Sequence, residues 1–341
     1  MRGWRGAARP TRGCWPPPPA RQERAAHRAR PTPDSAGLSL RGGHRTRKRG
    51  RLRALPLRAV MGIELAESIA VRLGAVSGVV AVATGDSFAR GMERQHTEVV
   101  LAIYYDPATP PSVAALRALA QELDERHPED AASDLGAWGP WLNGGARLVV
   151  NGRHVDWLYR DLRRVEQVVA DCLAGRVTCE YQPGYPHGFH NHIYLGELHA
   201  CRPLHDPHGV LATLKERVAT YPPAMRRAII KRYLEEAEST FQAARQAAQA
   251  GDVFFVSGCL FRGVACLVQV LYALEERYFV GERGALHEVT GFAQRPAGFV
   301  GDVASVLSQP GSSPATLSAS VSTLARFVGA LRAISAPILQ P

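Results

Sequence analysis

The spacing of apolar residues changes once along the chain, near residue 208, and this change restricts the possible folds more than any other feature. Upstream, apolar runs at residues 79–83 and 98–105 alternate with helical patterns at 61–75 and 111–126. Downstream, strand patterns stop and helical patterns follow at residues 209–219, 223–249, 252–280, 300–308 and 314–335. We therefore predict an α+β fold, with a mixed sheet and flanking helices at residues 61–205 and an all-α helical bundle at 206–341.

A β-hairpin at residues 146–159 is the clearest local signal in the chain. Asn151 and Gly152 form a favoured two-residue turn between two runs of strand-forming residues. Because side chains alternate along a strand, Trp157 and Tyr159 share one face of the second strand and Asp156 points to the other. A helical pattern that ends at Gly175 follows directly.

The first 60 residues are strongly basic. They contain 16 of the 41 Lys and Arg residues and two of the 31 acidic residues, Glu23 and Asp34. Since few apolar side chains are available to offset the entropy of ordering, we expect residues 1–60 to be disordered. This segment is an over-extended start before Met61, a flexible tail or a targeting sequence. The rest of the chain is slightly acidic, which argues against a nucleic-acid partner.

The apolar and cysteine patterns favour a protein of a reducing compartment. The most apolar stretch, residues 254–274, is interrupted by Arg262 and Gln269, so it predicts a buried bundle helix instead of a membrane span. The six cysteines include no Cys-x-x-Cys pair and are expected to be free thiols. We therefore expect a cytoplasmic protein without a membrane partner.

Three features in the first half suggest a site for a nucleotide. A turn at residues 85–91 follows the strand at 79–83 and offers backbone N–H groups to a phosphate. Glu98 begins the next strand, and Asp156 projects from the hairpin. Two carboxylates on neighbouring strands, roughly 4–7 Å apart, would hold Mg²⁺ on a triphosphate. Two other readings stay open: Glu98 is a solvated strand-end carboxylate, or Asp156 forms a structural salt bridge with Arg147 or Arg160.

This ordered set of residues resembles the nucleotidyltransferase superfamily, which includes antibiotic adenylyltransferases and minimal nucleotidyltransferases. The family turn, Gly-Gly/Ser-Ser-x-Ala-x-Gly, is similar to Gly85-Asp86-Ser87-Phe88-Ala89-Arg90-Gly91. Glu98 stands at the first position of the family's Asp-x-Asp/Glu strand, and Asp156 at the place of the third carboxylate. The resemblance extends over nearly all of residues 61–335 and implies a C-terminal helical domain of substrate-binding type.

The resemblance also implies roles for individual residues. Gly85, Ser87 and Arg90 would contact the nucleotide. Glu98 and Asp156 would be the catalytic carboxylates and would bind Mg²⁺ together with ATP or another NTP.

The sequence departs from the family pattern at two positions. Val100 stands where the second metal-binding carboxylate belongs, and Asp86 places a negative charge in the turn that binds phosphate in the family. Two function classes follow. The first is transfer of a nucleoside monophosphate from an NTP to a hydroxyl of a small molecule or a protein. The second is a catalytically degraded relative that binds a nucleotide or a partner.

Six of the twelve histidines lie between residues 187 and 208. Prolines and glycines between Tyr181 and Phe189 predict a shaped loop beside the site, with His187 as the residue that contacts substrate. His190 and His192 would share one face of a strand, as zinc ligands do. However, no second Cys/His pair with metal spacing follows, so we expect ordinary loop histidines.

Overall fold

A five-stranded mixed sheet forms the first part of the fold, with strand order β3-β4-β2-β1-β7. The computed structural model describes residues 57–85 and 99–340, which all belong to one unit, Ala54–Pro341. The expected disorder of residues 1–60 is wrong for residues 57–60, which begin the first helix. The rest of that segment lies outside the described residues. β2 runs parallel to β4, and the other neighbouring strands are antiparallel. The strands are β1 (Val79–Thr84), β2 (Val99–Tyr105), β3 (Gly145–Val150), β4 (Arg153–Asp161) and β7 (Pro203–His205).

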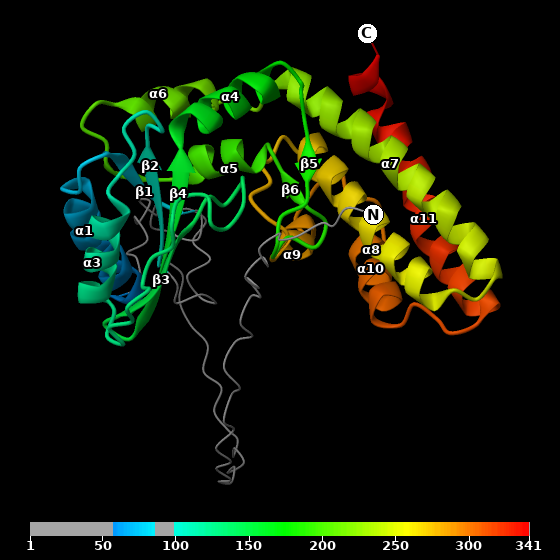
Figure 1. The fold of residues 1–341 in the computed structure, drawn as a ribbon. Helices are drawn as coiled ribbons and strands as arrows, with labels where there is room; N and C mark the ends of the chain where they lie inside the picture. The colour runs from blue at the N-terminus through cyan, green and yellow to red at the C-terminus, as the bar shows by residue number, and fades with distance from the viewer. Residues whose placement is uncertain (1–56, 86–98, 341) are drawn as a thin grey trace, which may run out of the picture. The chain divides into compact units, whose positions relative to one another are not determined.

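The predicted hairpin is β3 and β4. Its turn residues, Asn151 and Gly152, both have positive φ angles, 51° and 67°, as the expected turn type requires. Val155, Trp157 and Tyr159 are fully buried on one face of β4. They belong to a hydrophobic cluster with α1 (Leu57–Gly74) and α3 (Val113–Leu123), which cover this face of the sheet (Figure 1).

The opposite face of the sheet contacts the helical part of the chain through a second, larger hydrophobic cluster. This cluster includes Ala102 and Tyr104 of β2 and extends to Leu331 near the C-terminus. The predicted division of the chain after residue 205 stays a prediction. The remaining helices are α4 (Leu162–Leu173), α5 (Ile193–Ala200), α6 (Val210–Arg217), α7 (Pro223–Gln249), α8 (Val253–Leu274), α9 (Ala285–Val289), α10 (Phe299–Ser308) and α11 (Pro314–Leu339).

Three long helices, α7, α8 and α11, pack side by side in this helical part (Figure 1). Gly263 of α8 faces Phe241 of α7 so closely that a Cβ atom at Gly263 would lie 2.4 Å from the phenyl ring. The missing side chain therefore sets the distance between the two helices. Side-chain caps begin two of them: Asp252 accepts from the Phe255 N–H, and Ser313 forms a capping box with Thr316.

The prediction that residues 208–335 contain no strand is confirmed, since every element described in that range is a helix. The predicted helix at 252–280 is wrong at its C-terminal end, because α8 stops at Leu274. There Glu276 has a φ angle of 52°, and the Arg277 N–H donates to the Tyr272 carbonyl, which closes the helix. Strand β7 and strand β5 (Cys179–Glu180) were not predicted. Strand β6 (Phe189–His190) ends at His190, and His192 lies at the start of the next helix, so the two histidines do not share one strand.

Among the described residues, α8 and α11 are long and apolar enough to cross a membrane by length and composition alone. The same property is typical of the core helices of soluble bundles. Half of the apolar segment of α8 is buried inside the protein, and the corresponding share for α11 is 39%.

Candidate functional site

Strands β2 and β4 bring two of the sequence-selected positions together. In their parallel pairing Val100 lies directly beside Asp156. Since side chains of paired residues point to the same side of a sheet, Val100 and Asp156 share one face, opposite to the buried Val155 and Trp157. Glu98, the other expected carboxylate, lies outside the described residues, as do Ser87 and Arg90. The expected separation of Glu98 and Asp156 therefore stays a prediction.

Gly85 lies against Val100 at the end of β1. Its backbone N–H donates to the Val100 carbonyl at 2.7 Å, so this amide is occupied within the sheet. A Cβ atom at Gly85 would lie 2.9 Å from the Cβ atom of Val100, which shows that the turn begins with no room for a side chain. A nucleotide contact by Gly85 stays a prediction.

The structure assigns Arg160 a partner other than Asp156. Arg160 is fully buried and forms a bidentate ion pair with Glu197 of α5, with N–O distances of 2.9 and 2.7 Å. Its remaining nitrogen donates to the Tyr159 carbonyl at 3.1 Å. The sequence-based reading of an Asp156–Arg160 pair is therefore wrong. Arg147, the other suggested partner, lies opposite Asp156 in the pairing of β3 with β4.

A second polar cluster surrounds His187, in the loop between β5 and β6. The His187 imidazole is 1% exposed, and its backbone N–H donates to Oε1 of Glu282 at 2.8 Å. Nε2 of His187 lies 3.6 Å from Sγ of Cys266 on α8 and 3.8 Å from Oε1 of Glu236 on α7. The three side chains thus meet from a loop and two helices. A substrate contact by His187 stays a prediction.

The neighbouring histidines are buried in the core, so their interpretation as ordinary loop residues is wrong. His190 and His192 are exposed by 0% and 2%. Nδ1 of His190 lies 2.6 Å from the Tyr233 hydroxyl, and Nε2 of His192 lies 3.0 Å from Oε1 of Gln269. Burial lowers the pKa of His190 far below its ordinary value and that of His192 to about 4. Both rings are therefore neutral at physiological pH.

The acid–base properties of Glu236 and Cys266 differ strongly. The His187 ring, together with the Arg262 guanidinium, lowers the pKa of Glu236 to about 2, against the opposing effect of burial. Burial and the Glu236 carboxylate raise the pKa of the Cys266 thiol well above its ordinary value. Without a cation, the thiol is thus protonated and unsuited to nucleophilic attack.

The two helical residues could not be selected from the sequence. Glu236 and Cys266 lie 49 and 79 positions after His187 and follow no metal-ligand spacing. The sequence pointed to this cluster only through the run of prolines, glycines and histidines that ends at His192, which includes His187 but neither of the helical residues.

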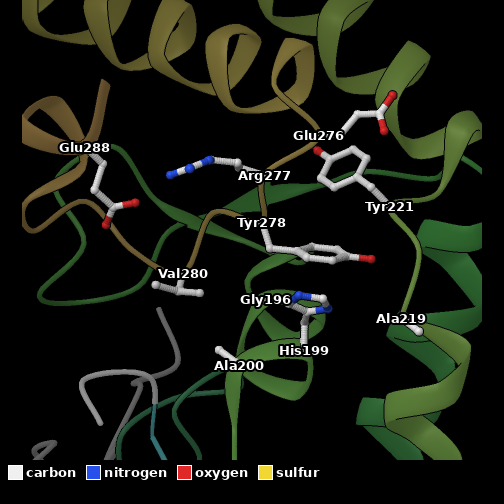
Figure 2. Close-up of a pocket in the computed structure, with 10 residues that line it drawn as sticks. All are labelled: Gly196, His199, Ala200, Ala219, Tyr221, Glu276, Arg277, Tyr278, Val280 and Glu288. Atoms are coloured by element: carbon white, nitrogen blue, oxygen red, sulfur yellow. The ribbon is translucent and has the colours of Figure 1, made fainter. Parts of the chain in front are cut away.

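A cavity of about 450 Å³ lies between α5 and the loop that follows α8 (Figure 2). The Tyr278 ring lies between the rings of Tyr221 and His199, at centroid distances of 4.9 and 4.8 Å. The Tyr278 hydroxyl donates to the Val218 carbonyl at 2.9 Å. None of the described residues that the sequence selected, Gly85, Asp156 and His187, lines this cavity.

Comparison with known proteins gives partial matches. Residues 191–282 match a family described as "Domain of unknown function (DUF4037)", and this range contains Glu236 and Cys266. A solved structure, a nucleotidyltransferase-like protein from Exiguobacterium sibiricum, is similar at 11% identity and a TM-score of 0.40. The similarity covers 81% of this chain and 77% of that one. A search of curated proteins gives no significant match.

Proposed function

We propose that this chain is a nucleotidyltransferase-like protein that binds a nucleotide at the Val100–Asp156 face of the sheet and transfers nucleotidyl groups slowly or not at all. The pairing of Val100 with Asp156 carries the proposal. It places an apolar side chain beside the carboxylate, at the position where the resemblance calls for a second metal ligand.

The described residues do not fit the family's Mg²⁺ site in full. Asp156 offers carboxylate oxygens, which are the donors that Mg²⁺ prefers, while Val100 offers none. A cation held by fewer carboxylates stabilises less of the charge that develops on a transferring phosphoryl group. We therefore expect the chain to keep nucleotide binding and to have lost efficient transfer of the nucleotidyl group.

Restoring the missing carboxylate is the direct test. We expect Val100→Asp to tighten Mg²⁺-dependent binding of ATP by about tenfold, equivalent to about 1.4 kcal/mol, in calorimetric titrations with and without Mg²⁺. Val100 is partly buried, so a thermal melting curve must show that the variant is folded. Adding Asp156→Asn to Val100→Asp should remove the gain, because one carboxylate is again missing.

Two matched controls separate this effect from a general gain of charge. Val149→Asp makes the same substitution at a partly buried position of β3, a strand that does not neighbour β2, and should leave ATP binding unchanged. Glu166→Gln removes an exposed carboxylate from α4 and should also have no effect. If folded Val100→Asp binds ATP no better than wild type, the nucleotide proposal is wrong. Rapid pyrophosphate release by the wild-type protein would instead show that transfer survives with Val100 in place.

A further inference from the structure

The cluster of His187, Glu236 and Cys266 carries an inference separate from the nucleotide proposal. We propose that these three side chains bind a divalent transition metal ion of the zinc class. Each contributes one ligand atom, and the three atoms all lie within 4.8 Å of one another. His187 and Cys266 are buried, and Glu236 is partly buried.

The two distances from His187 to its neighbours are close to those of a tetrahedral site. With Zn–N and Zn–O distances of about 2.0–2.2 Å and a Zn–S distance of about 2.3 Å, tetrahedral ligands lie roughly 3.3–3.6 Å apart. Nε2 of His187 is 3.6 Å from Sγ of Cys266 and 3.8 Å from Oε1 of Glu236. Small movements of these side chains would therefore bring the three ligand atoms to bonding distance from one ion.

The contacts behind His187 are compatible with the tautomer that a metal site needs. Nδ1 of His187 lies 3.2 Å from Nε2 of His190, and Nδ1 of His190 lies 2.6 Å from the Tyr233 hydroxyl. If each imidazole donates from Nδ1, the Nε2 lone pair of His187 points toward Glu236 and Cys266. Histidines that bind metal usually donate their other ring N–H to a neighbouring acceptor, and here the acceptor would be the His190 ring.

The ligand types select the metal. A set of one nitrogen, one oxygen and one sulfur donor suits zinc and related ions, whereas Mg²⁺ and Ca²⁺ prefer oxygen donors. Binding exchanges the thiol proton of Cys266 for the metal ion, and this proton is released to solvent. Because the protein supplies three ligands, the fourth position is left for a water molecule.

Arg262 is the competing cation in this cluster. Its Nη2 lies 2.5 Å from Oε1 of Glu236. The Arg262 side chain is 51% exposed, so solvent can hydrate its guanidinium if the ion pair opens. A carboxylate also has lone pairs enough to accept from an arginine and to ligate a metal at once.

Cobalt substitution tests the site on the full-length protein, because tetrahedral Co²⁺ bound to a thiolate has a near-ultraviolet charge-transfer band. Wild type is expected to bind about one Co²⁺ per chain with this band and to release it to an excess of Zn²⁺. Cys266→Ser should lose the band. Cys259→Ser, which changes a cysteine on the same helix outside the cluster, should keep it.

A second measurement covers the case in which a variant folds poorly. Zinc should raise the melting temperature of wild type and of Cys259→Ser, and should leave that of Glu236→Gln and Cys266→Ser unchanged. Wild-type protein that is folded but shows neither the cobalt band nor a zinc-dependent rise in melting temperature would overturn the proposal. Equal cobalt bands in wild type and Cys266→Ser would overturn it as well.

Discussion

At the scale of single residues, a neutral buried imidazole links folding to pH. His192 is 2% exposed, and its Nε2 atom is held by Gln269. Burial lowers its pKa in the folded protein from 6.5 to about 4. Below pH 6.5 His192 therefore binds a proton in the unfolded chain but not in the folded protein. The free energy of unfolding falls as the pH is lowered from 6.5 to about 4.

This loss amounts to about 3 kcal/mol from His192 alone. We expect the free energy of unfolding, measured in urea between pH 7 and pH 4, to fall less steeply in His192→Gln than in wild type. His190 acts in the same direction, so part of the slope will remain. His208→Gln changes an exposed histidine and should keep the wild-type slope. Identical pH profiles for all three proteins would contradict the neutral, buried state of His192.

At the scale of elements, the ion pair between Arg160 and Glu197 connects strand β4 to helix α5. Two nitrogens of the buried Arg160 guanidinium each donate a hydrogen bond to one carboxylate oxygen of Glu197. Removing one partner of a buried pair leaves an uncompensated charge, whereas replacing both with apolar side chains does not.

We therefore expect Glu197→Ala to lower the free energy of unfolding by about 3 kcal/mol, measured by chemical denaturation. The double variant Arg160→Met/Glu197→Leu should recover most of this loss. Glu238 pairs with Arg332 between α7 and α11, but both side chains are more than half exposed. Glu238→Ala should therefore lower stability by less than about 1 kcal/mol. If Glu197→Ala and Glu238→Ala lower the free energy of unfolding by similar amounts, burial does not make the Arg160–Glu197 pair more important for stability than an exposed pair.

At the scale of the whole molecule, stability should come from the chain after Met61. The buried side chains of α1 that pack on the sheet are Ala66, Ile69, Ala70 and Leu73. A start at Met61 removes the first turn of α1, residues 57–60, but keeps all four of these buried side chains. We expect a chain that begins at Met61 to melt at the same temperature as the full chain in a thermal scan.

A chain that begins at Val76 provides the comparison for that experiment. It lacks the buried face of α1, which stabilises the sheet by several kcal/mol on the scale of about 1.5–3 kcal/mol per large apolar side chain. This chain should melt at a much lower temperature or fail to fold. A drop of several degrees on starting at Met61 would mean that the first segment packs on the rest of the protein.

The sequence by itself determined the elements that depend on neighbouring residues. Asn151 and Gly152 predicted the hairpin, and its alternation placed Asp156 on the face opposite Trp157. The five helical patterns after residue 208 correspond to described helices, because a long amphipathic pattern is a local property. Helix α5 was missed since its residues are buried on nearly every side, which leaves no periodic pattern to detect.

Only the tertiary structure decided which distant residues meet. Strand β7 joins the sheet beside β1, more than 110 positions earlier in the chain, through pairs such as Val82 with His205. Arg160 meets Glu197 instead of Asp156, and His187 meets Glu236 and Cys266. These contacts arise from the packing of β4 with α5 and of the His187 loop with α7 and α8. No spacing along the chain encodes them, because the distance between two side chains on different elements depends on how those elements pack.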